Sequence, residues 1–170
     1  MNFIKYFKKR ILQKKIKTNN KRDKAFHYIE DSEKIAFIIN SDNNSLIKLY
    51  EYFIKDLKKQ KKIISELFIS KIKTKKEQNL PENTVSIADN NWIKSDIVQK
   101  FISGKYDILF VVFEKMVLEV QYLSSTIKAD LKISPNYTNF NTADITFHVE
   151  EDNFNEYFKA INQYIRKNKK

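Results

Sequence analysis

The sequence predicts an α/β protein of three layers: a doubly wound, mostly parallel sheet of five or six strands, with an N-terminal basic helix. Segments with strand character alternate with segments of helical periodicity, which is the pattern of βαβ units. Two strand segments, residues 34–40 (KIAFIIN) and 107–113 (DILFVVF), are nearly continuous apolar runs. Such runs are typical of parallel strands buried on both faces. The 170 residues fit one domain, since domains usually have about 100–200 residues.

The first element that we expect is a helix over residues 3–17, where apolar side chains recur at a four-residue spacing. These side chains are Phe3, Phe7 and Ile11. Residues 18–20 (Thr-Asn-Asn) interrupt the pattern and predict a joint. We therefore divide the chain into residues 1–24, a basic amphipathic helical arm, and residues 25–170, a single α/β domain.

The first half of the domain is expected to alternate between strands and one long helix. Residues 34–40 predict the first strand, and the Ser-Asp-Asn-Asn segment that follows contains residue types that cap helix N-termini. The next helix has one apolar stripe. The stripe consists of Leu46, Leu49, Tyr50, Phe53 and Leu57. Residues 63–69 and 84–88 predict the second and third strands, because both are short and rich in β-branched residues.

A short helix is expected over residues 95–103. Ser95 is a good N-cap, and Gly104 ends the helix. Gly104 is the only glycine of the chain, and helix termination is a sufficient reason for it.

The second half of the domain continues the alternation. Residues 107–113 predict the central strand, and residues 115–129 a helix. Two shorter strands are expected at residues 130–133 and 144–149, followed by a final helix that Asp152 caps. The apolar stripe of this last helix consists of Phe154, Tyr157, Phe158, Ile161, Tyr164 and Ile165.

Positive charge is concentrated in the arm. The chain has a net charge of +11, and its first 24 residues contain ten basic residues and one acidic residue, Asp23, so they carry nine of these charges. The basic residues are candidates for binding an anion. They are Lys5, Lys8, Lys9, Arg10, Lys14, Lys15, Lys17, Lys21, Arg22 and Lys24.

Three interpretations of the arm remain open. It could neutralise nucleic-acid phosphates, lie on an acidic membrane surface with its apolar stripe inserted, or pack that stripe on the domain. Eight of its ten basic residues are Lys rather than Arg. Base-specific readout relies on the bidentate Arg fork, so no DNA sequence specificity is expected.

The composition argues against several classes of site. The chain has no cysteine, so it has no disulfide and no thiolate metal site. Glycine-rich phosphate loops need several glycines, and the two histidines, His27 and His148, belong to no catalytic or ligand constellation. We therefore predict no catalytic residue, no metal and no cofactor, and an enzymatic activity is not favoured.

One group of polar residues could still form a crevice, because ligands of open α/β sheets bind at the carboxyl ends of the strands. Converging carboxylates there could hold a divalent cation, whereas Asp residues in these positions also begin turns and cap helices. Trp92 could stack on a ligand or form an aromatic lid on the edge of the core. The possible crevice comprises Asp42, Asp89, Asn91, Trp92 and Glu114.

The chain also resembles an uncharacterised bacterial domain-of-unknown-function family of small cytoplasmic α/β proteins. The resemblance covers nearly the whole chain and rests on several stretches rather than on one motif. These are MNFIKYFKKR, KIAFIIN, ADNNWIKS, KYDILFVVF, IKADLKISPNY and ADITFHVE. The family implies an α/β fold and a cytoplasmic location, but no activity and no catalytic residues.

The sequence thus favours a non-enzymatic binding module whose basic arm contacts a polyanion, with RNA or the ribosome as the favoured partner. One alternative is an enzyme, or a degenerate enzyme, that resembles nucleotide-sugar transferases and uses the crevice. The other is a peripheral membrane protein anchored by the arm. The longest apolar runs are too short for a bilayer, which needs about 20 residues, and the N-terminus has no apolar segment of a secretory signal. The expected location is therefore the cytoplasm.

Overall fold

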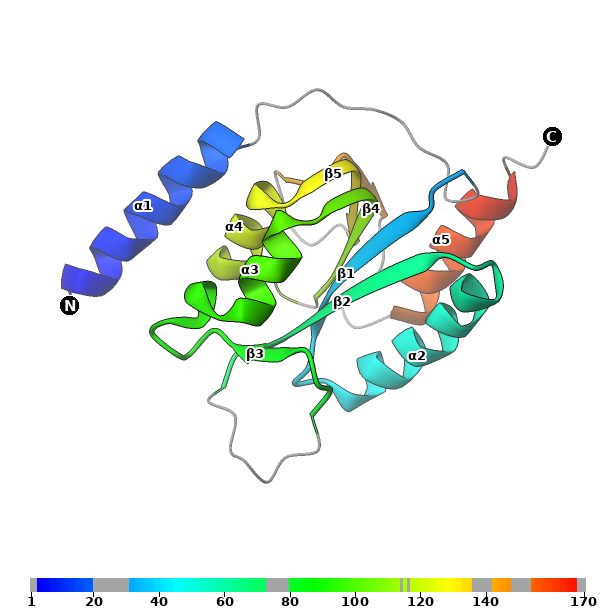
Figure 1. The fold of residues 1–170 in the computed structure, drawn as a ribbon, viewed down its shortest axis with the longest axis horizontal. Coiled ribbons are helices and arrows are strands. Elements are labelled where there is room, and N and C mark those ends of the chain that lie inside the picture. The colour runs from blue at the N-terminus through cyan, green and yellow to red at the C-terminus, as the bar shows by residue number, and fades with distance from the viewer. Residues whose placement is uncertain are drawn as a thin grey trace.

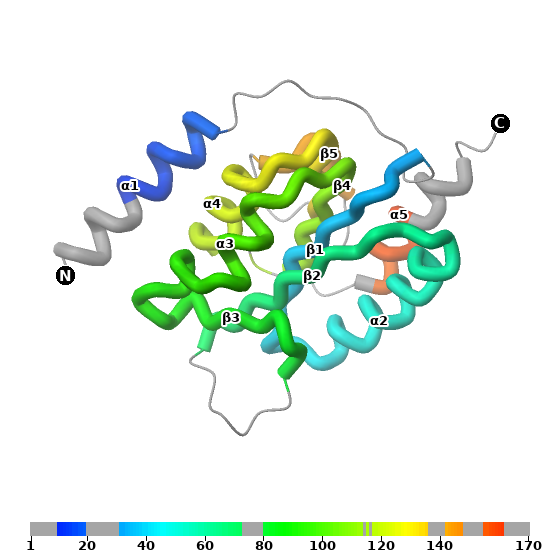
Figure 2. Tube along the Cα trace, viewed as in Figure 1, coloured from blue at the N-terminus to red at the C-terminus, as the bar shows by residue number. Residues whose placement is uncertain are grey.

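The computed structural model describes residues 3–19, 31–72, 80–113, 115, 117–135, 142–147 and 154–167, with the backbone alone for residues 3–9, 154 and 162–167. Figure 2 shows in colour the residues that are described with their side chains. The first described helix is α1 (Phe3–Asn19), which extends two residues beyond the helix that the sequence predicts.

A six-stranded sheet forms the centre of the fold, and each pair of neighbouring strands in it is parallel. The strands lie in the order β3-β2-β1-β4-β5-β6 (Figure 1). Their bounds are β1 Lys34–Asn40, β2 Ile63–Ser70, β3 Thr84–Ser86, β4 Lys105–Val112, β5 Lys128–Pro135 and β6 Ile145–Phe147. The predicted parallel sheet of five or six strands is confirmed, and the predicted central strand is β4.

Helices cover both faces of this sheet, which confirms the three-layer prediction (Figure 1). Helices α2 (Asn44–Lys59) and α5 (Phe154–Lys167) pack on one face, in a cluster with Phe37 and Phe110. Helices α3 (Asp96–Ser103) and α4 (Leu118–Thr126) pack on the other face. A short 3₁₀ helix, η1 (Trp92–Lys94), precedes α3.

The two central strands divide their side chains between the two faces. In β1, Phe37 belongs to the α2–α5 cluster and Ile38 to the α3–α4 cluster, and both have no exposed surface. In β4, Phe110 lies on the same face as Phe37, and the two rings stack with centroids 5.0 Å apart. This burial on both sides explains why both strands read as unbroken apolar runs.

Several element boundaries differ from the predicted ones. The helix expected over 115–129 is α4, which ends at Thr126, because Ile127 is extended and Lys128 already pairs with Lys105 in the sheet. Strand β5 is correspondingly longer than the predicted 130–133. The spacing of Val120, Leu123 and Ile127 suits a longer helix, but strand pairing overrides that periodicity.

The reason for the single glycine also differs from the expected one. Gly104 follows α3, but its φ of −64° is open to any residue. A Cβ at this position would lie 2.3 Å from the hydroxyl oxygen of Tyr106. That hydroxyl donates a hydrogen bond to the carbonyl oxygen of Phe101 at 2.9 Å. The close approach of the Tyr106 ring, rather than helix termination, therefore requires glycine here.

A buried lysine holds the end of α4. Lys132 is 1 % exposed, and its Nζ donates a hydrogen bond to the carbonyl oxygen of Ser124, in the last turn of α4. The last four carbonyls of a helix have no partner within the helix, and a cation there also interacts favourably with the helix dipole. The Ser124 hydroxyl accepts a further hydrogen bond from Thr142. Lys132 thus ties the C-terminal turn of α4 to β5.

We predict that Lys132→Ala lowers the free energy of unfolding by about 2–4 kcal/mol, because it opens a cavity and leaves a buried carbonyl without its donor. Urea denaturation followed by circular dichroism measures the change. Lys128→Ala, at an exposed position of the same strand, is the matched control and should change stability by no more than about 0.5 kcal/mol. Equal effects of the two substitutions would contradict the role given to Lys132.

Candidate anion-binding site

The C-terminal half of the arm helix packs on the domain. Helix α1 contacts α4, and Ile16 is 7 % exposed in this contact, with Leu12 half-buried beside it. Ile11, which belongs to the predicted apolar stripe, is 45 % exposed instead. Leu12 and Ile16 face α4. Ile11 precedes Leu12 by one position, and successive residues of a helix point about 100° apart, so Ile11 lies on a different face of α1.

Polar contacts fix the end of α1 against the last turn of α4. The Asn19 amide nitrogen donates to the hydroxyl of Thr126 at 3.2 Å and to that of Ser125 at 3.5 Å. Both hydroxyls in turn donate to the carbonyl oxygen of Tyr122 at 2.8 Å. Lys15 Nζ lies 5.7 Å from the centre of the Tyr122 ring, in cation–π range. The predicted joint at residues 18–20 is therefore wrong for its first two residues, because Thr18 and Asn19 still belong to α1 and Asn19 anchors the helix to α4.

The structure describes the side chains of four of the ten basic candidates, and all four are exposed. They are Arg10, Lys14, Lys15 and Lys17. Lys5, Lys8 and Lys9 lie in α1, but their side chains are outside the described part of the chain. Lys21, Arg22 and Lys24 are also outside the described residues.

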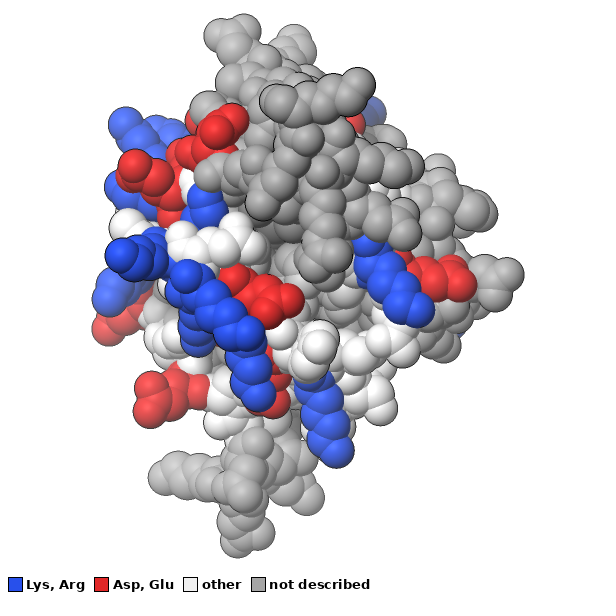
Figure 3. Space-filling model, turned by 90° about the vertical axis from the view of Figure 1, so that its right-hand side faces the viewer, with Lys and Arg blue, Asp and Glu red and all other residues white. Residues whose placement is uncertain are grey.

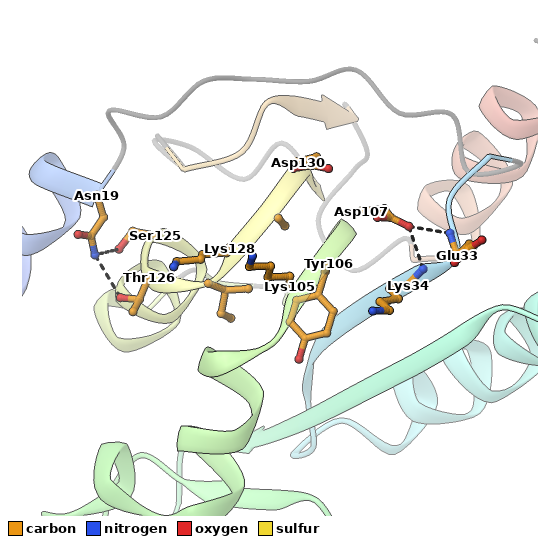
Figure 4. Close-up of a pocket in the computed structure, with 12 residues that line it drawn as sticks. Asn19, Glu33, Lys34, Lys105, Tyr106, Asp107, Ser125, Thr126, Lys128 and Asp130 are labelled. Atoms are coloured by element: carbon orange, nitrogen blue, oxygen red, sulfur yellow. Dashed lines mark hydrogen bonds between the residues drawn. The ribbon is translucent and has the colours of Figure 1, made fainter.

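A groove lies beside this contact, at the edge of the sheet where the strands begin (Figure 4). Its volume is about 680 Å³, and α1, α4 and the first residues of β1, β4 and β5 form its walls. Three lysines line it, each the first residue of its strand. They are Lys34, Lys105 and Lys128.

Sequence reasoning missed these lysines, although a signal was present. Three apolar strands each begin with Lys, in KIAFIIN, KYDILFVV and KADLKISP. Parallel strands all begin at the same edge of a sheet, so first residues of neighbouring strands gather there. The positions become informative only when the strand order is known, because β4 and β1 are distant in sequence and adjacent in the sheet.

The electrostatics of the groove differ between its two ends. At the β4–β5 end, Lys105 pairs in register with Lys128, and within the described part of the chain neither ammonium group has a hydrogen bond or ion pair. At the β1 end, Asp107 Oδ2 accepts hydrogen bonds from the backbone N–H groups of Glu33 at 2.6 Å and Lys34 at 2.9 Å. The β4–β5 end has two lysines and one carboxylate, Asp130, whereas the β1 end has one lysine and two carboxylates, Glu33 and Asp107, so the β4–β5 end is the more positive of the two.

On the side of the molecule that carries α2, the described residues include charged side chains of both signs. Figure 3 shows this side, on which Lys and Arg side chains are interspersed with Asp and Glu. On α2, for example, Lys59 forms an ion pair with Asp56 at 3.5 Å. Interspersed charges of this kind solubilise a surface without attracting a polyanion.

Asp42, the crevice residue that follows β1, accepts hydrogen bonds with both of its carboxylate oxygens. Asp42 Oδ1 accepts from the hydroxyl of Ser70 at 2.6 Å, and Oδ2 accepts from the backbone N–H of Lys71 at 2.7 Å. Asp42 thus joins the end of β1 to the end of β2. Helix α2 is capped instead by Asn43, whose Oδ1 accepts from the backbone N–H of Leu46 at 3.0 Å.

The other crevice residues lie at the edge of the sheet or outside the described residues. Asp89, Asn91 and Trp92 line a separate groove of about 450 Å³ beside β3, two strands away from β1. Trp92 is 8 % exposed and packs in the α3–α4 cluster. Glu114 is not among the described residues. In the part of the chain that the structure describes, no three His, Cys, Asp or Glu side chains gather as metal ligands would.

The sheet order and the helices on both faces define a doubly wound α/β protein of the Rossmann type. The chain belongs to a family of unknown function, DUF6913, whose model matches residues 5–167. This membership confirms the resemblance to a domain-of-unknown-function family. No curated protein and no solved structure matches the chain. None of the helices in the described residues has the length and apolar character needed to cross a bilayer.

We predict that Ile16→Ala loosens α1 from α4 without unfolding the domain, because Ile16 belongs to neither of the two core clusters. Hydrogen exchange of the amides of residues 12–19 should accelerate, while exchange in β4 stays unchanged. Ile11→Ala is the matched control, since it makes the same chemical change at an exposed position of the same helix. Acceleration of similar size in both variants would show that helix propensity, not packing, is responsible.

We also predict that the three carboxylates of the crevice differ in their contribution to stability. Asp42→Ala should cost about 1–2 kcal/mol, because it removes two hydrogen bonds, whereas Asp89→Ala and Glu114→Ala should each cost less than about 1 kcal/mol. Thermal denaturation with and without MgCl₂ measures both stability and cation binding. A Mg²⁺-dependent stabilisation that Asp89→Ala and Glu114→Ala abolish would favour the enzyme alternative instead.

Proposed function

We propose that this protein is a non-enzymatic binding module that contacts a polyanion through α1 and the neighbouring start of the sheet. RNA, free or in the ribosome, is the favoured partner, because it is the most abundant polyanion of the cytoplasm, where we propose that the protein acts. The observation that carries the proposal is the packing of α1 against α4. Ile16 and Asn19 attach the helix to α4, and the exposed Lys14 and Lys17 remain available for a ligand.

The chemistry of the basic residues favours contact with the phosphate backbone. Each phosphate that a lysine neutralises releases condensed counterions, and this release provides affinity without sequence selection. Eight of the ten basic residues of the arm are Lys, which binds as a point charge and lacks the bidentate geometry of Arg. Lys34, Lys105 and Lys128 add further cations on the strands beside α1, in a groove that Glu33, Asp107 and Asp130 also line.

A peripheral membrane role is the second candidate, and the exposure of Ile11 favours it. Ile11 is 45 % exposed on α1, and the helices that lie in membrane interfaces combine exposed apolar residues with flanking lysines. The two candidates differ in which side chains of the arm they need. RNA binding requires the cations, whereas membrane attachment also requires the apolar stripe.

We predict that deletion of residues 1–24 leaves a folded domain that has lost most of its affinity for RNA. The domain should fold because both core clusters consist of residues from Ile35 onward. Fluorescence anisotropy with a single-stranded RNA over a series of salt concentrations measures the affinity. For the full chain, the slope of log K against log salt should be about −0.7 for each phosphate contact. Undiminished RNA affinity of the truncated protein would refute the proposal.

The triple substitution Phe3→Ser, Phe7→Ser and Ile11→Ser separates the two candidates. We expect it to leave RNA affinity nearly unchanged, because it removes no positive charge from the arm. Sedimentation with vesicles of acidic lipid provides the second measurement. The membrane role would replace the proposed one under two conditions. The parent protein binds the vesicles and the triple variant does not, and neither protein binds RNA.

A further inference from the structure

We propose that the β4–β5 end of the groove binds one phosphate dianion, which the terminal phosphate of an RNA strand would supply. The inference rests on the proposed function and adds to it a defined site with a preference for strand ends. It starts from the register of two neighbouring strands, in which Lys105 lies beside Lys128. Both side chains extend to the side of the groove on which Ser125 and Thr126 lie, while Lys34 lies apart, beside Asp107 (Figure 4).

The spacing of the two lysines suits a single phosphate. Neighbouring strands are about 4.8 Å apart, so two ammonium groups that start from paired residues can reach oxygens of the same phosphate group. A phosphodiester carries one negative charge, whereas a phosphate monoester carries between about −1.5 and −2 at neutral pH. The two positive charges of Lys105 and Lys128 therefore match a terminal phosphate better than an internal one.

Three carboxylates, Glu33, Asp107 and Asp130, also line the groove, but among the described residues none of them forms an ion pair or a hydrogen bond with Lys105 or Lys128. Asp107 Oδ2 accepts two backbone N–H groups at the β1 end, and Glu33 lies at the same end (Figure 4). Asp130 already takes part in another interaction. Two like charges held side by side repel each other, and a bound dianion would relieve this repulsion. The exposed Lys105–Lys128 pair, which forms no ion pair within the described residues, is thus placed for a ligand rather than for stability.

The walls of the groove favour recognition of the phosphate rather than of a base. Asn19, Ser125 and Thr126 form one hydrogen-bonded wall, which fixes its shape. Tyr106, the aromatic residue of the lining, is 9 % exposed, and its hydroxyl donates to the carbonyl oxygen of Phe101. Tyr106 therefore offers no exposed ring face on which a base could stack. Preference for a strand end should accordingly be independent of the terminal base.

The test compares two single-stranded RNA 12-mers of the same sequence, one with a 5′-phosphate and one with a 5′-hydroxyl, both labelled at the 3′ end. We expect the full chain to bind the phosphorylated strand about three- to tenfold more tightly, as two exposed charge pairs can provide. The double variant Lys105→Gln and Lys128→Gln should bind both strands equally. Lys55→Gln with Lys58→Gln, at exposed positions of α2, removes the same charge and should keep the preference.

The outcomes separate this inference from the proposed function. Equal affinity of the parent protein for both strands, or a preference that survives in the Lys105–Lys128 variant, would overturn the terminal-phosphate site. The proposed function would still stand if the hydroxyl-ended strand binds and deletion of residues 1–24 abolishes that binding. If neither strand binds, both fail. Unchanged melting curves of the variants by circular dichroism would show that lost charge, not unfolding, causes the effect.

Discussion

The parallel pairing of β1 with β4 is the interaction on which the rest of the molecule depends. The two strands lie at the centre of the sheet, and their side chains are buried on both faces. Phe37 stacks on Phe110 towards α2, while the alternate residues pack towards α3 and α4. Burying both faces of a strand demands a helical layer on each side. The doubly wound arrangement is the consequence.

A sheet of this kind leaves its two ends as the places for polar side chains. At the carboxyl end, Asp42 joins β1 to β2 through Ser70 and Lys71, so its carboxylate already serves the fold. At the amino end, three neighbouring strands each begin with an exposed lysine, and among the described residues no hydrogen bond engages the ammonium groups of Lys105 and Lys128. Rossmann-type proteins bind ligands outside the carboxyl ends of their strands. Our proposals place the ligand of this protein at the opposite edge.

The short helix α4 connects the fold to this edge. Lys132 holds its last turn from within the sheet, and the hydroxyls of Ser125 and Thr126 on the same turn receive Asn19 of α1. The position of α1 thus depends on Lys132, a buried residue of β5, through the last turn of α4. Changes that weaken α4 should therefore displace the basic helix as well as destabilise the domain.

The local pattern of the sequence was sufficient for much of the fold. Unbroken apolar runs identified β1 and β4, and the stripe from Leu46 to Leu57 identified α2, because burial imposes a period that is visible in the residues themselves. The concentration of charge in the first 24 residues likewise needs no structure. The ends of helices and strands were harder to predict from the sequence. Lys128 and Ala129 continue a helical pattern, yet pairing with β4 places them in a strand.

Only the tertiary structure decided which residues meet. The face of α1 that packs contains Ile16 rather than Ile11, because the surface of α4, and not the helix alone, selects it. The single glycine is required by the ring of Tyr106, a contact that no local rule for helix ends contains. Lys105 and Lys128 are 23 positions apart and become neighbours only through strand order and register. Sequence determines the local period and the charge of a segment, whereas the assembly of the sheet determines which distant side chains share one site.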